Sequence, residues 1–389
     1  MSIQTLFQDH FQRQPTLAVR APGRVNLLGE HVDYNDGVVL PAAIDREVSL
    51  AAAPSLDGMV SIIAVDLEKS VSFRLSELDQ RQDENGEPLP SWARYPAGVA
   101  WALQKAGKLV SGIQAAFTSN VPIGSGLSSS AAVEVAFAAA WRKLDGWTAN
   151  CVDLARMCQM AENQYVGVNC GLMDQFASAC GVAGHLLCFD TRSLDWSPIP
   201  LPADTVVVIA DTGVRRSLTT SAYNERRASC EQAVEILQRY LPNIHSLRDV
   251  STVEFAAYSE FLPEVTRKRA EHIVKEIARV DQAVISLRQG KAEIFGGLMY
   301  SGHASLRDLY EVSCPELDIM VNLTRQLPGC YGARLTGAGF GGCTVNLVKT
   351  SQAQAFIQGL GDGYQRETGR EAAIYLCRAS DGASADWIK

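Results

Sequence analysis

Residues 112–144 have the order strand, glycine-rich loop, helix, which constrains the fold more than any other part of the chain. Alternating polarity over residues 112–119 predicts a strand, and the loop at 122–131 (PIGSGLSSSA) opens into an alanine-rich helix that ends near residue 144. The free N–H groups and positive dipole end of such a helix bind anions, and glycines let the backbone approach a phosphate. This order of elements therefore predicts a phosphate site.

The loop at 122–131 matches neither of the two common phosphate motifs. No Lys-Ser/Thr pair follows its glycines, and the G-x-G-x-x-G spacing is missing. Taken alone, the loop is also compatible with a flexible turn whose serines cap the following helix.

The size and charge of the chain limit what it binds. With 389 residues it is long enough for about two domains that need no disulfide or metal for stability. A net charge of −8 does not suit a nucleic-acid or anionic-membrane partner. We therefore expect a small-molecule substrate.

The cysteines and the N-terminal segment bear on location. Ten cysteines are scattered along the chain, and none forms a C-x-x-C pair. Residues 1–14 have apolar side chains in helical spacing but no cationic start, and no run of 18 apolar residues is present, so neither a signal peptide nor a membrane span is predicted. We expect reduced thiols, rather than a disulfide or zinc framework, and a cytoplasmic location.

A proline-rich break at residues 197–202 divides the chain. Its three prolines disfavour regular structure, and the β-branched run at 205–209 predicts the first strand of a new sheet. We place a domain boundary here, which gives an N-terminal domain of residues 1–200 and a C-terminal domain of residues 201–389. In the second domain, residues 265–289 predict a long amphipathic helix. Strands and helices do not alternate regularly, so the predicted fold class is α+β.

Residues 23–34 read GRVNLLGEHVDY and are too polar for a packed core. Turns prefer glycine, asparagine and aspartate, but they need neither a cation nor a histidine. Carboxylates beside a guanidinium, on a loop after the apolar strand at 17–19, suit recognition of a polyhydroxylated ligand and stabilisation of developing negative charge. A transition-metal site at His31 and Asp33 is not favoured, because no second histidine is near.

Two further carboxylates are candidates for chemistry. Glu162 lies on the apolar face of a helix predicted around residues 151–165, where a carboxylate needs a partner or a cation. An internal salt bridge or a helix-end position is the alternative. Asp174 lies in the segment NCGLMDQ, where it is also placed to cap a following helix that begins at Gln175. Arg24 is likewise compatible with an ordinary structural ion pair.

Four segments resemble motifs of the galactokinases, a branch of the GHMP kinase family: residues 23–34, 122–131, 169–175 and 335–343. The last reads LTGAGFGGC, which on its own also fits a glycine-rich hairpin. The resemblance covers nearly the whole chain, with small departures such as Gly302, where the family commonly has serine. It implies a two-domain α+β GHMP kinase fold with the active site in the cleft between the domains.

The resemblance also implies roles for individual residues. Asp174 would take the proton from an anomeric hydroxyl, with Arg24 beside it to keep the carboxylate ionised and offset phosphoryl charge. Glu162 and Ser130 would bind Mg²⁺, which takes a few oxygen ligands and fills its shell with water and phosphates. The residues implied to bind the sugar are Glu30, His31, Val32, Asp33 and Tyr223, although Tyr223 also suits half-buried packing. The residues implied to bind the nucleotide are Gly124, Ser125, Gly126, Leu127, Ser128, Ser129 and Ser130.

The implied activity is Mg²⁺-ATP-dependent phosphorylation of α-D-galactose at its anomeric hydroxyl, the first committed step of galactose catabolism. The implied partners are galactose and ATP, with no nucleic acid and no membrane, and we expect a monomer. One alternative is an N-acetylgalactosamine kinase or another small-sugar kinase of the family. The other is a non-catalytic galactose and ATP sensor, which the intact Ser130-Ala131 pair disfavours, because such sensors lack a Ser-Ala pair in this loop.

Overall fold

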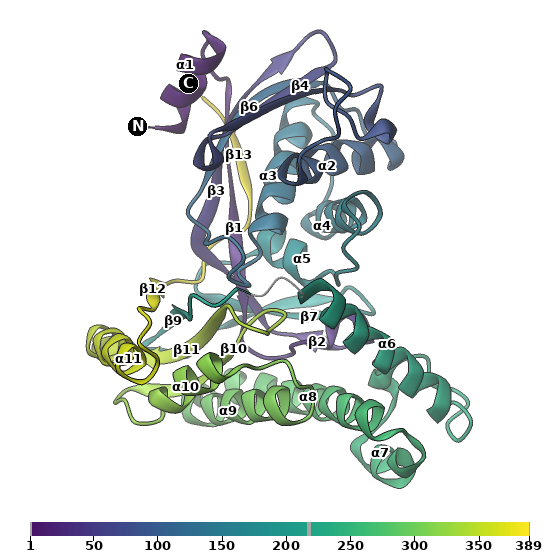
Figure 1. Ribbon diagram of the computed structural model, residues 1–389, viewed down its shortest axis with the longest axis vertical. Helices are drawn as coiled ribbons and strands as arrows, with labels where there is room; N and C mark the ends of the chain where they lie inside the picture. Colours follow the sequence, from purple (N-terminus) through teal and green to yellow (C-terminus); the bar gives the residue numbers. More distant parts are fainter. Residues whose placement is uncertain (1, 216–218, 389) are drawn as a thin grey trace.

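A six-stranded sheet forms the upper part of the molecule in the computed structural model, which describes residues 2–215 and 219–388 (Figure 1). The spatial order of the strands is β13-β1-β3-β6-β4-β5, and only β4 and β6 pair in parallel. The strands are β1 (Leu17–Asn26), β3 (Pro41–Ser55), β4 (Met59–Ala64), β5 (Lys69–Arg74), β6 (Gly112–Ser119) and β13 (Ser384–Trp387). Because β13 pairs with β1, the C-terminal tail returns to the sheet on which the chain begins.

Helices cover both faces of this sheet. Apolar side chains of the sheet and of the helices on one face form a single core, whereas Phe7 of α1 packs against the opposite face (Figure 1). The helices are α1 (Ile3–Phe11), α2 (Arg94–Lys105), α3 (Ser129–Leu144), α4 (Cys151–Met160) and α5 (Met173–Cys180). The strand, loop and helix predicted for residues 112–144 are therefore confirmed as β6 and α3.

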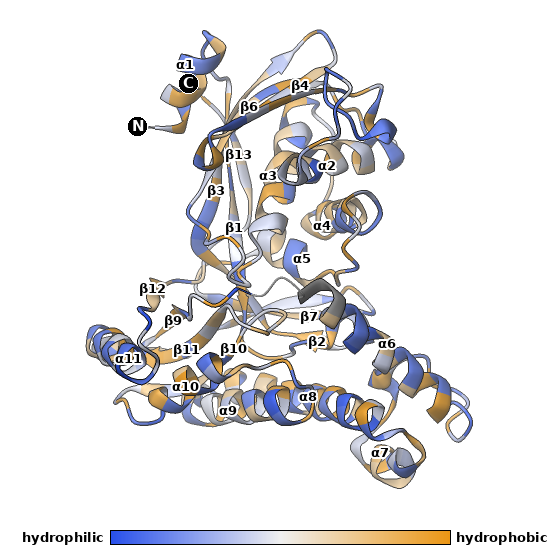
Figure 2. Cartoon of the chain, in the orientation of Figure 1, coloured by the Kyte–Doolittle hydropathy of each residue, from blue (hydrophilic) through white to orange (hydrophobic). Residues whose placement is uncertain are grey.

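A four-stranded sheet of order β10-β11-β9-β12 forms the core of the lower part. Figure 2 shows hydrophilic and hydrophobic residues interspersed along α8, the helix predicted at 265–289, as expected of an amphipathic helix. The strands are β9 (Thr205–Asp211), β10 (Cys330–Leu335), β11 (Cys343–Lys349) and β12 (Ala373–Cys377). The helices are α6 (Thr219–Leu237), α7 (Thr252–Tyr258), α8 (Glu264–Arg288), α9 (Ala292–Asp308), α10 (Pro315–Thr324) and α11 (Ala353–Thr368).

A third sheet has three strands: β2 (Val38–Val39), β7 (His185–Asp190) and β8 (Trp196–Pro200). In the chain, β8 directly precedes β9 of the four-stranded sheet. The prediction that the prolines disfavour regular structure at 197–202 is wrong, because β8 covers most of that run. Among the strands that the structure describes, β8 pairs with β7 alone. A strand at the edge of a sheet tolerates proline where the N–H that proline lacks would point to solvent. The strand predicted at 205–209 is confirmed as β9, which begins a different sheet. The boundary at residue 200 stays a prediction.

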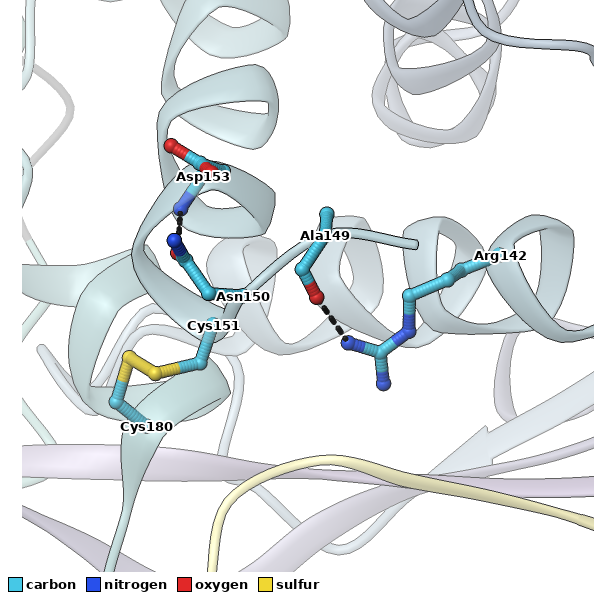
Figure 3. Close-up of a disulfide and its surroundings, with 6 residues drawn as sticks. All are labelled: Arg142, Ala149, Asn150, Cys151, Asp153 and Cys180. Carbon is cyan, nitrogen blue, oxygen red and sulfur yellow. Dashed lines mark hydrogen bonds between the residues drawn. A yellow bond between two sulfur atoms is a disulfide. The ribbon is translucent and has the colours of Figure 1, made fainter. Parts of the chain in front are cut away.

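One disulfide corrects the expectation that all cysteines are reduced. Cys151 and Cys180 are bonded, with their Cα atoms 5.3 Å apart (Figure 3). Cys151 begins α4, which Asn150 caps by accepting the backbone N–H of Asp153, and Cys180 ends α5. The packing of α4 against α5 brings the two sulfurs together across 29 residues of sequence, which no local spacing reveals.

Within the described residues, no helix is both long enough and apolar enough to cross a membrane.

Candidate active site

A cavity of about 210 Å³ lies where the two halves of the chain meet. Its walls come from the end of β1 and the loop after it, from α5 and α6, from the turn after α4, and from the loop between β10 and β11. The predicted residues that line it are Arg24, Glu30, His31, Asp33, Glu162, Asp174 and Tyr223. The fold thus gathers seven predicted side chains into one site.

Arg24 and Asp174 form a two-point ion pair in this cavity. The Nε and Nη2 atoms of Arg24 each donate to a carboxylate oxygen of Asp174 at 2.8 Å. Ser128 Oγ donates a third bond to Asp174 at 2.5 Å, and Arg24 Nη1 donates to the carbonyl of Gly126 at 2.5 Å. Paired N–H donors on a carboxylate fix its orientation.

The backbone around Arg24 explains how the pair forms. Residues 23–26 belong to β1, so the loop predicted for residues 23–34 begins only after Asn26. The register of β1 shifts between Pro22 and Arg24, and a Cβ on Gly23 would lie 2.7 Å from the carbonyl oxygen of Leu127. Glycine at this position therefore lets the loop after β6 approach β1 closely.

The position of Asp174 in α5 differs from that of a helix cap. The helix begins at Met173 rather than Gln175, which puts Asp174 in its first turn. Its carboxylate accepts from Arg24 and Ser128 instead of capping the helix. A side chain held this way in a cavity is placed to accept a proton from a bound ligand.

His31 is held by aromatic side chains. Its Nδ1 atom hydrogen bonds with the Tyr34 hydroxyl at 2.9 Å, and its ring centroid lies 4.8 Å from that of Tyr310 and 5.5 Å from that of Tyr223. Burial lowers the pKa of His31 to about 3, so the imidazole is neutral at physiological pH. Its Nε2 atom has no hydrogen-bond partner among the described residues, which leaves it for a ligand hydroxyl.

Glu30 and Asp33 have different surroundings. Glu30 is fully buried and accepts hydrogen bonds from the backbone N–H of Gly337, at 2.6 Å, and from the side-chain amide of Asn26. Burial raises the pKa of Glu30, although nearby Arg334 opposes the rise. Glu30 therefore ties the loop after β1 to the loop after β10.

Asp33 presents its carboxylate to the cavity. Burial, together with the negative charges of Asp174 and Glu30, raises the pKa of Asp33 to about 7. Its Oδ2 atom lies against Gly171, where an added Cβ would be 1.8 Å away. Only glycine at 171 leaves room for this carboxylate.

The other two residues predicted to bind the sugar lie in different places. Tyr223, on α6, lines the cavity, and its ring centroid is 5.4 Å from that of Tyr34. Val32 is fully buried in the hydrophobic core and does not line the cavity. Any contribution of Val32 to ligand binding is therefore through the shape of the loop.

Glu162 lies at the edge of the cavity. It belongs to a π-helical turn (Ala161–Val166) that continues α4, and its side chain is buried as predicted. Its Oε2 atom accepts from Gln175 Nε2 at 2.5 Å and from Cys170 Sγ at 3.2 Å. Burial raises the pKa of Glu162 to about 7. The ion pairs found within the described residues do not include Glu162, so the salt-bridge alternative is not seen.

The surroundings of Glu162 suit Mg²⁺. Ser130, at the start of α3, lies close enough to the Glu162 carboxylate for its hydroxyl to oppose the rise in the pKa of Glu162. The described residues contain no group of three or more histidine, cysteine or acidic side chains that could hold a metal without other ligands. A carboxylate and a hydroxyl, completed by water and phosphates, match the ligand preference of Mg²⁺.

The glycine-rich loop borders a second cavity, of about 470 Å³. Gly124, Gly126 and Ser128 all have positive φ angles, which turn the loop sharply. Leu127 and Ser125 are buried, and Ser125 Oγ donates to the carbonyl of Pro122 at 2.7 Å. The side chains of Leu127 and Ser125 therefore hold the loop together, and these two residues would contact a ligand through their backbone.

The start of α3 is open to a ligand. Ser128 occupies the N-cap position but makes no side-chain bond to the helix, because its hydroxyl donates to Asp174. The alternative of a turn with serine caps therefore does not describe this loop. Ser129 and Ser130 follow in the first turn, where backbone N–H groups favour an anion.

Two buried polar residues beside Glu162, Gln175 and Glu134, were not predicted from the sequence. Gln175 Nε2 donates to Glu134 Oε2 at 3.0 Å as well as to Glu162, and both Gln175 and Glu134 are fully buried. A signal for Glu134 was present, since it is the one carboxylate in the apolar helix after Ser130 and lies four residues from that serine.

Comparison with known proteins gives the class of the chain first. The model of the GHMP kinases N terminal domain matches residues 94–182, and that of the GHMP kinases C terminal domain matches residues 283–365. A mevalonate kinase crystal structure superimposes with a TM-score of 0.65 at 19% identity, covering 93% of this chain and 98% of that chain. The predicted two-domain α+β fold of the GHMP kinases is thereby confirmed.

More similar relatives narrow the assignment. The galactokinase galactose-binding signature matches residues 5–54. The galactokinase of Roseiflexus sp. (strain RS-1) is 46% identical, and the human galactokinase 42%, each over 97% of this chain and 94% of the relative. The crystal structure of Lactococcus lactis galactokinase complexed with galactose superimposes with a TM-score of 0.93 at 33% identity, over 98% of both chains. The chain belongs to the galactokinase family and is an ATP-dependent sugar kinase.

Proposed function

We propose that this protein transfers the γ-phosphoryl group of ATP to the anomeric hydroxyl of α-D-galactose, giving galactose 1-phosphate and ADP. The observation that carries this proposal is the position of the Arg24–Asp174 pair between two cavities. Asp174 lines the smaller cavity, and Arg24 also bonds to the Gly126 carbonyl in the loop beside the larger one. A sugar in the first cavity and a nucleotide in the second would meet at this pair.

The chemistry follows from that position. As the anomeric oxygen forms a bond to the γ-phosphorus, the bond between that phosphorus and the β,γ-bridging oxygen breaks, and ADP leaves. Asp174 accepts the proton of the attacking hydroxyl. Arg24 orients the Asp174 carboxylate and offsets negative charge on the phosphoryl group in transit.

Mg²⁺ is part of the proposal. Ser130 and Glu162 would hold it, because together they offer two hard oxygen ligands beside the start of α3. When bound, the cation offsets charge on the nucleotide phosphates. The loop at 122–131 would hold those phosphates with its backbone N–H groups.

The sugar would be recognised by Asp33, His31 and Tyr223. Galactose and glucose differ only in the direction of the C4 hydroxyl, which an apolar pocket separates poorly. A partly buried carboxylate that accepts a bond from the axial hydroxyl does better, because the wrong epimer leaves that carboxylate unpaired. Asp33 is our candidate for this acceptor, and Glu30 maintains the loop that carries it. A monomeric state and a cytoplasmic location remain predictions.

A coupled assay of ADP release tests the proposal. The substrates are galactose, glucose, arabinose, N-acetylgalactosamine and mevalonate, each with Mg²⁺-ATP. We expect galactose to exceed glucose by about 10³-fold or more in kcat/KM, within the range that polar sites reach. Equal rates with galactose and N-acetylgalactosamine would favour the alternative of a kinase with broader sugar specificity. The absence of sugar-dependent ADP release would contradict the proposal.

A further inference from the structure

Three helical segments bring three buried polar side chains together behind the active-site cavity. Glu134 comes from α3, Gln175 from α5, and Glu162 from the π-helical turn after α4. Glu134 and Gln175 are fully buried, and Glu162 is 6% exposed. Two carboxylates buried this close to one another need a physical reason.

The amide of Gln175 bridges the two carboxylates. Its –NH₂ group has two N–H donors, and its nitrogen lies 2.5 Å from Glu162 Oε2 and 3.0 Å from Glu134 Oε2. Cys170 Sγ donates to the same oxygen of Glu162 at 3.2 Å. One oxygen of the Glu162 carboxylate is therefore held by two donors.

This arrangement is poor for stability alone. Burial raises the pKa of Glu134, and the neighbouring Glu162 raises it further, so burying both acids is costly. Glu134 Oε1 and Gln175 Oε1 have no hydrogen-bond partner among the described residues. Apolar side chains of similar volume would fill the space at lower cost.

The sequence neighbours of these residues connect them to the site. Gln175 directly follows Asp174, so one turn of α5 presents Asp174 to the cavity and Gln175 to the buried acids. Glu134 lies one helical turn after Ser130, and side chains four residues apart share a helix face. Of the two proposed metal ligands, Glu162 therefore belongs to this buried cluster, and Ser130 lies on the same helix as Glu134.

We propose that Gln175 and Glu134 are positioning residues that hold the Glu162 carboxylate in place for Mg²⁺, an inference that rests on the proposed function. Gln175 donates to Glu162, and Glu134 accepts the second N–H of Gln175, which fixes the orientation of its amide. Partners that orient metal ligands in this way typically contribute about 10–100-fold to metal affinity.

Matched substitutions test this inference. Gln175→Met keeps the approximate volume but removes both donors. Gln159→Met is the control, because Gln159 is a neighbouring glutamine that donates to the Cys170 carbonyl, at 3.3 Å, and not to Glu162. Glu134→Gln keeps an acceptor for Gln175, whereas Glu134→Met removes it.

The main readout is Mn²⁺ affinity of the ADP-bound protein, measured by electron paramagnetic resonance, with the Mg²⁺ dependence of galactose phosphorylation and the Tm beside it. We expect Gln175→Met and Glu134→Met to weaken Mn²⁺ binding by about 10-fold or more, and to raise the Mg²⁺ concentration for half-maximal rate similarly. At saturating Mg²⁺ the kcat should recover to within about 3-fold, with the galactose KM unchanged. Gln159→Met and Glu134→Gln should bind Mn²⁺ within about 3-fold of the wild type.

Two results would overturn the inference. One is equal Mn²⁺ affinity in Gln175→Met and Gln159→Met, and the other is equal affinity in Glu134→Gln and Glu134→Met. If Gln175→Met does not fold, the Glu134 pair decides. Because Mn²⁺ binding is measured without sugar, it separates a failure of this inference from a failure of the proposed galactose phosphorylation.

Discussion

Replacing Asp174 with asparagine removes a proton acceptor while keeping the shape of the side chain. A group that accepts a proton only in the transition state affects kcat, whereas a group that binds the sugar affects both states. Loss of a general base lowers rates by about 10²–10⁴-fold, equivalent to about 3–5 kcal/mol of transition-state stabilisation. We therefore expect a large fall in kcat and a small change in the galactose KM.

The structure also sets the cost to stability. Removing one partner of a fully buried ion pair costs about 3–5 kcal/mol. Arg24 is 4% exposed, but the side chain of Asp174 is 27% exposed, and Arg24 keeps its bond to the Gly126 carbonyl. We expect a loss of about 1–2 kcal/mol in the free energy of unfolding, which leaves the variant folded.

Steady-state kinetics and urea unfolding of Asp174→Asn, Arg24→Ala and the double variant check this reasoning. The loss of transition-state stabilisation in the double variant should be smaller than the sum of the losses in the two single variants, because the residues act as a unit. Ser128→Ala, which removes the third bond to Asp174, provides a milder comparison. A fully active Asp174→Asn protein would refute the role of this carboxylate as a base.

Further predictions concern the metal, selectivity, pH and the disulfide. Glu162→Gln should strongly reduce Mg²⁺-dependent turnover with little change in Tm, and an unchanged Mg²⁺ titration would contradict the metal assignment. Asp33→Ala should lose most galactose efficiency and narrow the galactose-to-glucose ratio of kcat/KM, which is measured with both sugars. Because the pKa of Asp33 rises from 3.8 unfolded to about 7 folded, the folded protein loses stability as pH rises through this range. Asp33→Asn should therefore be more stable relative to the wild type at pH 8 than at pH 4, by urea unfolding at both. Cys151→Ser should lower the free energy of unfolding by about 3–4 kcal/mol without reductant, and dithiothreitol should abolish the difference.

Local patterns predicted much of this protein. The strand, loop and helix over residues 112–144 follow from alternation, glycines and an alanine-rich run, all of which act over a few residues. The polar segment containing Arg24, Glu30 and Asp33 was recognisable as a candidate binding site because such charged side chains are rare in a packed core. Motif resemblance then brought Asp174 into the same site, and the structure places these side chains around one cavity.

Features that depend on tertiary packing were not predictable in this way. Cys151 and Cys180 meet only because α4 packs on α5. Gln175 joins two acids from different helices, and its sequence neighbours give no sign of either. The strand β8 was misjudged because proline is compatible with an edge strand, and the position of a strand in a sheet is not a local property.

The identity of the bond that forms is the most direct test of the central claim. The purified protein is incubated with Mg²⁺-ATP and α-D-galactose, and the products are followed by ³¹P and ¹H nuclear magnetic resonance. We predict ADP and one new phosphate monoester whose phosphorus couples to the anomeric proton of galactose. A phosphate on any other carbon, or ADP formed without a sugar phosphate, would contradict this account.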